Sequence, residues 1–193
     1  MTPDDATHYR IVAAAAEHCD RLLPIELASA SIFPDEDVPP RLKVFGIPAS
    51  MHRRAAEEGR LWVALAAPAA PALRAESRGG SGETPVGFAH VTMVDDNPYV
   101  FEVDVHPAHA RRGVGTRLMR AVESWAREKG FGAVTLTTFS HLPWNAPFYA
   151  RLGFREIPEA DLTPGLRAQL AREAANGLDP AKRVAMRLPL VGG

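Results

Sequence analysis

One stretch of the chain, EVDVHPAHARRGVGTRLM at positions 102–119, constrains the fold more than any other. It runs from an alternating apolar and polar segment, 99–106, typical of a strand with one buried face, into a helical repeat that ends at Gly130. Gly113 and Gly115 stand where the helix begins. Free N–H groups and the helix dipole attract anions there, and glycines let an anion approach closely. The stretch alone predicts either a phosphate-binding turn or a plain helix start with close helix–strand packing.

The spacing of the glycines argues against two familiar nucleotide-binding motifs. A P-loop requires Gly-Lys-Ser/Thr, but Thr116 and Arg117 follow Gly115 here. A Rossmann turn requires a third glycine three positions further on, where this chain has Leu118. A nucleotide-binding protein of either type is therefore disfavoured.

The composition is that of an ordinary globular protein. The chain has 193 residues, of which 46% are hydrophobic and 23% charged, with a net charge of −1, so we expect one domain and no nucleic-acid partner. Apolar segments such as 61–71 are shorter than the roughly 20 residues of a membrane span. The acidic start of the chain is unlike a signal sequence, so we expect no membrane and a cytoplasmic location. The single cysteine, Cys19, is interpreted as a core residue rather than a nucleophile.

The order of the predicted elements indicates an α/β domain on a mixed sheet. Pro24 is expected to break or kink the first helix. The segment 68–85 is rich in Pro, Gly and Ser and predicts a long mobile loop rather than a linker between domains. Strands are expected at 9–15, 60–67, 86–94, 99–106, 133–139, 154–157 and 182–190, and helices at 17–33, 48–58, 117–129, 144–153 and 163–177.

Three motifs in a fixed order carry a resemblance to a known family. They are VHP at 105–107, ARRGVG at 110–115 and YARLGF at 149–154. Together they resemble the GNAT superfamily of acyl-CoA-dependent N-acyltransferases, closely over 99–154 and by element order over most of the chain. The resemblance implies a single α+β domain over 1–193, with a mixed, mostly antiparallel central sheet of about seven strands flanked by helices.

The resemblance also implies that acetyl-CoA is the co-substrate and that it binds at the glycine turn. Ala110 stands where the family usually has Gln or Arg, so that side-chain contact is absent while backbone binding is expected to survive. Asn145 lies four residues before Tyr149 rather than the family's seven, which we expect to keep it on the same helical face. The expected cofactor contacts are Val103, Asp104 and Val105 for the pantetheine arm, Arg111, Arg112, Gly113, Val114, Gly115 and Thr116 for the diphosphate, and Asn145 and Tyr149.

The implied chemistry is direct attack of a neutral amine on a thioester. A free alkylammonium has a pKa of about 10, so a base must remove its proton. Glu102 is the first candidate and Asp104 the second, on the polar face of the strand, where their adjacency should raise the pKa of one of them. A solvated strand face is the alternative. Tyr149 is the family-matched proton donor to the leaving thiolate, or else a core residue beside Phe148 and Phe154.

The predicted function is therefore acetyl-CoA-dependent N-acetyltransfer to a primary amine of a small molecule. Acetylation of peptide or protein amines and a non-catalytic acyl-CoA sensor are the alternatives. His141 is expected either to line the acceptor pocket or to be a loop residue, and the acidic segment 33–40 either favours cationic amines or is a solvated loop. His106 and His109 lack metal-ligand spacing, so no metal is predicted. We expect a monomer or a homodimer.

Overall fold

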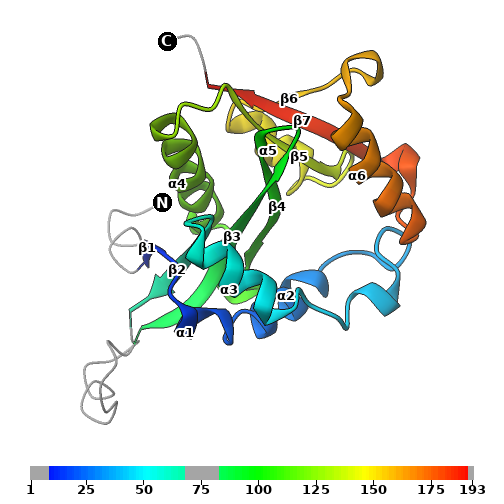
Figure 1. Ribbon diagram of the computed structural model, residues 1–193. Coiled ribbons are helices and arrows are strands. Elements are labelled where there is room, and N and C mark those ends of the chain that lie inside the picture. The colour runs from blue at the N-terminus through cyan, green and yellow to red at the C-terminus, as the bar shows by residue number, and fades with distance from the viewer. Residues whose placement is uncertain (1–8, 68–82, 191–193) are drawn as a thin grey trace, which may run out of the picture. The chain divides into compact units, whose positions relative to one another are not determined.

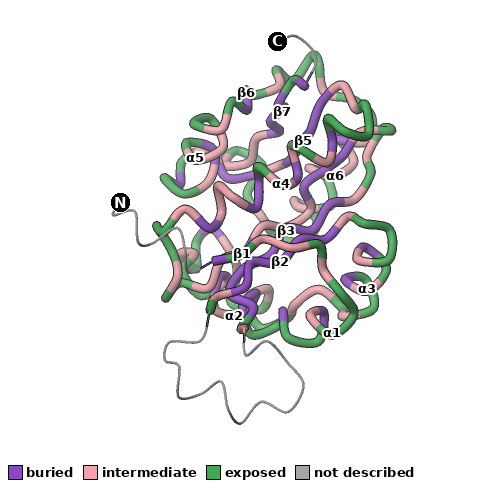
Figure 2. Tube along the Cα trace, turned by 90° about the vertical axis from the view of Figure 1, so that its left-hand side faces the viewer, coloured by how far each residue is buried: buried purple, intermediate pink, exposed green. Residues whose placement is uncertain are grey.

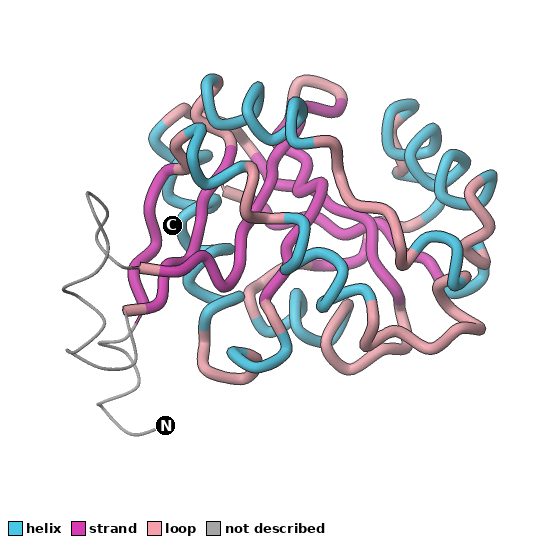
Figure 3. The backbone as a smooth tube through the Cα atoms, turned by 90° about the horizontal axis from the view of Figure 1, so that it is seen from below, coloured by secondary structure: helices cyan, strands magenta, loops and turns pink. Residues whose placement is uncertain are grey.

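The computed structural model describes residues 9–67 and 83–190 (Figure 1). Within these residues seven strands form one sheet in the order β1-β2-β3-β4-β5-β7-β6, and helices flank it (Figure 3). The strands are β1 (Tyr9–Ala13), β2 (Leu61–Ala66), β3 (Thr84–Val94), β4 (Asn97–Val105), β5 (Ala133–Phe139), β6 (Arg155–Glu156) and β7 (Arg183–Pro189). The helices are α1 (Ala16–Cys19), α2 (Leu23–Ala30), α3 (Ala49–Glu57), α4 (Val114–Glu128), α5 (Ala146–Arg151) and α6 (Pro164–Ala175).

The sheet is mixed and mostly antiparallel, which confirms the predicted fold class. The antiparallel pairs are β1–β2, β2–β3, β5–β7 and β6–β7. β4 and β5 are parallel, with Tyr99 opposite Thr135. β3 and β4 are joined by Asp95 and Asp96, whose φ angles of 48° and 58° are those of a type I′ hairpin turn. Aspartate tolerates this left-handed backbone better than most side chains do.

The chain comprises two compact units, and the boundary between them runs through β3, β4 and α4. The first unit contains Met1–Ile32, Gly46–His90 and Glu102–Ala121, and the second contains Phe33–Phe45, Val91–Phe101 and Val122–Gly193.

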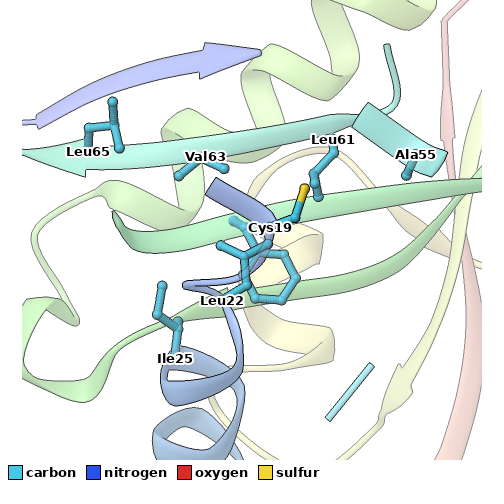
Figure 4. Packing of buried hydrophobic residues seen from close by; sticks show 8 residues of the cluster. Cys19, Leu22, Ile25, Ala55, Leu61, Val63 and Leu65 are labelled. Atoms are coloured by element: carbon cyan, nitrogen blue, oxygen red, sulfur yellow. The ribbon is translucent and has the colours of Figure 1, made fainter. Parts of the chain in front are cut away.

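The core of the first unit lies between its helices and the strands β2 and β3 (Figures 2 and 4). Cys19 is 2% exposed within this core, and burial raises the pKa of its thiol. This confirms Cys19 as a core residue. The cluster consists of Cys19, Leu22, Ile25, Ala55, Leu61, Val63, Leu65 and Phe88.

The second unit is built on β5, β6 and β7, with α6 packed against β5 and β7. Thr163 caps α6 by accepting a hydrogen bond from the Leu166 N–H. Asp95 accepts from the Gly165 N–H at the same helix start, at 3.0 Å. The hairpin turn is thereby fixed to the beginning of α6.

Some predicted boundaries were wrong. The helix expected at 17–33 is two helices, because the chain turns at 20–22, and Pro24 stands in the first turn of α2, where its missing N–H is not needed. β3 begins at Thr84, inside the predicted loop 68–85, while 68–82 lie outside the described residues.

Candidate active site

The turn between β4 and α4 has a backbone that suits an anion. Arg111 and Gly113 have φ angles of 57° and 77°, whereas the φ of Arg112 between them is not positive. Such an alternation turns successive N–H groups toward one side. The Arg117 N–H donates to the Gly113 carbonyl at 3.0 Å and closes the first turn of α4, so the N–H groups of 114–116 have no acceptor within the helix.

A tyrosine from the first strand braces this turn. The Tyr9 hydroxyl lies 2.9 Å from Nδ1 of His109, and the two rings meet edge to face. Arg112 donates to the same hydroxyl at 3.4 Å. Burial, and then the nearby Arg112 charge, lower the pKa of His109, which favours the neutral imidazole that can accept from Tyr9. Sequence reasoning missed Tyr9, because nothing in the local pattern connects it with a turn 100 residues further along the chain.

These residues fit a diphosphate-bearing ligand such as CoA. Gly113 needs its left-handed conformation for the turn, and a Cβ built there meets nothing within 4 Å, so that side of the backbone is open. Arg111 and Arg112 are exposed beside it and supply positive charge. The expected phosphate residues, 111–116, therefore share one turn, and Val103, Asp104 and Val105 form the end of the strand that leads into it.

Asp104 does not lie on a solvated strand face. Asp104 is 7% exposed, and Ser29 of α2 forms a hydrogen bond with its carboxyl. Burial raises the pKa of Asp104 to about 7, the charge of Glu26 adds to this, and the bond with Ser29 opposes it. The expectation of a raised carboxyl pKa is confirmed in direction, but the causes are burial and Glu26 of α2. Glu102 is half-buried.

Glu26 belongs to a buried polar group. Its Oε1 lies 2.8 Å from Nε2 of His52 on α3, and its Oε2 accepts from the Ile47 N–H at 2.6 Å. His52 is 1% exposed and its ring stands 5.1 Å from that of His90 on β3. Glu26 and His52 were not predicted from the sequence, although an acid within the mostly apolar LPIELASA is a signal that could have indicated Glu26.

In the second unit, Asn145 and Tyr149 lie at the start and the middle of α5. Asn145 is the N-cap, with φ −109° and ψ −112°, and its carbonyl accepts from the Tyr149 N–H at 3.1 Å; its expected place on the same helical face as the family's asparagine stays a prediction. Its Nδ2 donates to Thr138 at 2.8 Å, and its buried Oδ1 has no hydrogen-bond partner among the described residues. Tyr149 stands edge to face against Phe148 and Phe154, as the core alternative expects. Both predicted roles toward CoA stay predictions.

The acidic segment 33–40 is not simply a solvated loop. Asp37 is 3% exposed and accepts from Lys182 at 2.6 Å and from His141 at 3.1 Å. The bond with Lys182, and then that with His141, lower the pKa of Asp37 despite its burial. Phe33 packs against Phe139 at 5.8 Å. His141 thus helps to hold the segment 33–40 in place.

Two kinds of feature are absent from the part of the chain that the structure describes. Across 9–67 and 83–190, no three His, Cys, Asp or Glu side chains are grouped as metal ligands would be. In that same part of the chain, no helix combines the length and apolar character that crossing a membrane requires.

The chain belongs to the GNAT family of acetyltransferases, whose family model matches residues 39–154, more than half of its length. It is 36% identical to mouse N-alpha-acetyltransferase 80 over 80 residues, which are 39% of this chain and 24% of that protein. The chain thus spans about a quarter of the length of this relative.

Solved structures show the same fold. The ribosomal-protein-S18-alanine N-acetyltransferase of Escherichia coli matches with a TM-score of 0.60 at 16% identity over 96% of each chain. A GNAT-family acetyltransferase of Staphylococcus aureus Mu50 matches with a TM-score of 0.62 at 17% identity over 94% of this chain and 99% of that one. The PaiA N-acetyltransferase of Thermoplasma acidophilum, solved in complex with coenzyme A, matches with a TM-score of 0.57 at 14% identity over 94% and 98%.

Proposed function

We propose that this protein transfers the acetyl group of acetyl-CoA to a primary amine, with Asp104 as the general base. One observation carries the proposal: a buried carboxyl with a pKa of about 7 stands on the strand that leads directly into the anion-binding turn. A base with a pKa near neutral pH is half ionised under working conditions and still takes up a proton readily. The structure favours Asp104 over Glu102 because Asp104 has the stronger desolvation.

In this proposal each residue has a separate task. The turn at 111–116 binds the diphosphate through its N–H groups, and the backbone of 103–105 aligns the pantetheine arm. Asp104 accepts the proton of the substrate ammonium, which frees the nitrogen lone pair to form the new C–N bond as the C–S bond breaks. Tyr149 donates its hydroxyl proton to the departing thiolate, and the second proton that the nitrogen loses as the amide forms restores the Tyr149 hydroxyl.

The acceptor is proposed to be a primary amine of a small molecule. A second candidate is the α-amine of a polypeptide, which is favoured by the local similarity to a mouse protein named as an N-alpha-acetyltransferase. Thiol release from acetyl-CoA, measured against a panel of small amines and of short peptides with free or blocked N-termini, separates the two. A cytoplasmic location and a monomeric or homodimeric state also stay predictions.

Three conservative variants test the proposed chemistry. Asp104→Asn is expected to lower kcat by about 100-fold or more, Tyr149→Phe by about 10-fold or more, and Glu102→Gln by much less. If Glu102→Gln is the damaging variant and Asp104→Asn is active, the base is Glu102. If CoA binds but no amine of the panel is acetylated above background hydrolysis, the non-catalytic sensor replaces the enzyme.

A further inference from the structure

A cavity of about 290 Å³ lies within the second unit, where the β3–β4 hairpin, the beginning of β5, the end of β7 and the beginning of α6 come together. Its volume is close to the lower end of the range of small-molecule sites, roughly 300 Å³. Apolar walls come from Val94, Ile157 and Leu166. Two guanidinium groups, those of Arg155 and Arg187, also line it. Within the described structure, none of the residues proposed above to contact acetyl-CoA lines this cavity.

The two arginines stand side by side on one face of the sheet. Arg155 lies directly opposite Arg187 in the antiparallel β6–β7 pair, and Arg187 lies opposite Thr135 of β5. Residues directly opposite each other point to the same face, with Cβ atoms about 4.5–5.5 Å apart. The next pair, Glu156 with the buried Met186, belongs to the other face. Because like charges in opposite positions repel, the two strands hold Arg155 and Arg187 together at a cost in stability.

Neither guanidinium has an acidic partner. Among the described residues, the guanidinium groups of Arg155 and Arg187 form no ion pair and no hydrogen bond. Asp95 also lines the cavity, but its carboxylate accepts from the Gly165 N–H at 3.0 Å and from the Thr163 hydroxyl. The Asp95 oxygens are therefore engaged at the beginning of α6 rather than with the arginines.

Another arginine on the same face of β7 is neutralised by the fold itself. Arg183, four residues before Arg187, donates to Glu173 of α6 at 2.9 Å and lies 4.5 Å from the centre of the Phe139 ring. Helix α6 thus supplies a counter-ion at that end of the strand but not beside Arg187. Asp161 also lines the cavity and forms no ion pair with either arginine in the described structure. The paired positive charges are left available to a ligand.

We propose that this cavity binds a small organic acid, a carboxylate on an apolar body of a few carbon atoms. The carboxylate accepts from Arg155 and Arg187, because the planar fork of a guanidinium matches its two oxygens. The carbon skeleton packs against Val94, Ile157 and Leu166. Binding removes the repulsion between the two arginines. Two guanidinium groups repel an alkylammonium, so the cavity does not suit the amine acceptor, and this inference is independent of the proposed acetyl transfer.

The direct test is an NMR titration of the full chain with sodium benzoate at constant ionic strength. The Nε–H signals of Arg155 and Arg187, assigned by substitution, are expected to shift and to saturate with a Kd of about 1 mM. Cyclohexylammonium, an apolar cation of similar size, is expected to cause no shift, and inorganic phosphate is expected to bind more weakly. Shifts that do not saturate, or phosphate that binds as tightly as benzoate, overturn the proposal.

Substitutions of the exposed arginines locate the binding site. Arg155→Gln and Arg187→Gln are each expected to weaken benzoate binding by about 10-fold or more. Arg187→Lys keeps the charge without the fork and is expected to lie between Arg187→Gln and the wild type. Arg151→Gln is the matched control, since Arg151 is an exposed arginine of α5 that does not line the cavity. Equal Kd values in the wild type and both Gln variants contradict the site.

Thermal unfolding gives a second readout of the same site. Benzoate at about 20 mM is expected to raise the Tm of the wild type by about 4 °C or more, and that of Arg155→Gln or Arg187→Gln by much less. A rise as large in both variants as in the wild type overturns the proposal.

A titration with benzoate in the presence of saturating CoA separates the cavity from the turn at 111–116. The Kd for benzoate is expected to be unchanged. Loss of benzoate binding in the presence of CoA would refute a separate site for the organic acid, while leaving the proposed acetyl transfer untouched.

Discussion

The hydroxyl of Tyr9 and Nδ1 of His109 lie 2.9 Å apart, and this contact joins the first strand to the turn that precedes α4. Tyr9 is 6% exposed, so its phenol is held by the core while its oxygen reaches the turn. Arg112 donates to the same oxygen. The phosphate-binding geometry proposed for 111–116 thus depends on a residue outside every family motif.

Tyr9→Phe is expected to raise KM for acetyl-CoA by about 3- to 10-fold with little change in kcat, because one hydrogen bond contributes about 0.5–1.5 kcal/mol. Steady-state kinetics at saturating amine measures both constants. Tyr99→Phe is the matched control, since the Tyr99 hydroxyl bonds Thr137 in the second unit instead. An unchanged KM in Tyr9→Phe means that the turn holds its shape without this brace.

Gly113→Ala and Gly130→Ala form a matched pair. Both glycines have a φ of 77°, and a Cβ at either meets nothing within 4 Å, so both substitutions cost stability by the same backbone strain of about 1–2 kcal/mol. Only Gly113 belongs to the proposed phosphate turn. We expect equal losses in urea denaturation, but a weaker affinity for CoA, measured by calorimetry, in Gly113→Ala alone. Equal CoA affinities in the two variants would place the diphosphate elsewhere.

Ala110→Gln restores the side chain that the family usually carries before this turn. We expect the affinity for CoA to change by less than about 2-fold, because the N–H groups of 111–116 are present whatever side chain stands at 110. Calorimetric titration with CoA checks this. A large gain in affinity would show that side chains, rather than the backbone, dominate binding at this turn.

Asp104 gives the protein a pH-dependent stability. Its folded-state pKa of about 7 lies above the unfolded value of about 3.9. Between these values the folded protein keeps a proton that the unfolded chain has lost, so the free energy of unfolding falls as the pH rises from about 4 to 7. Asp104→Asn is expected to be the more stable protein at pH 8, by urea denaturation. A wild type at least as stable as Asp104→Asn at pH 8 contradicts this.

His90 changes the free energy of unfolding in the opposite direction over much of the same pH range. Its pKa is lowered to about 4, so the unfolded chain gains a proton first and stability is lost as the pH falls from about 6.5 to 4. In Asp104→Asn the fall in stability that Asp104 causes with rising pH is removed. The rise in the free energy of unfolding that His90 causes is then no longer offset. The free energy of unfolding of this variant is therefore expected to rise more steeply between pH 4 and about 6.5 than that of the wild type.

The fold was predictable because its signals are local. The alternation in 99–106 and the helical repeat after Gly113 reappear as β4 and α4, in which Leu118 and Val122 are buried as their spacing indicated. The break between α1 and α2 was misplaced because Pro24 is equally compatible with ending a helix and with beginning one.

The site was predictable only where its residues belong to one continuous sequence motif. The turn at 111–116 was found from its glycines, whereas the burial of Asp104 depends on α2, which reaches β4 through tertiary packing. A strand pattern shows that a carboxyl stands on a polar face, but it does not show what covers that face. For the same reason Tyr9, Glu26 and His52 were missed.

The ion pair between Asp37 and Lys182 joins residues that are 145 positions apart. During synthesis the segment around Asp37 therefore leaves the ribosome long before its partner has been translated. Until then this buried carboxylate lacks its strongest counter-ion, and the contact of Phe33 with Phe139 is also incomplete. The segment 33–45 is thus expected to be among the last parts of the nascent chain to reach its final place.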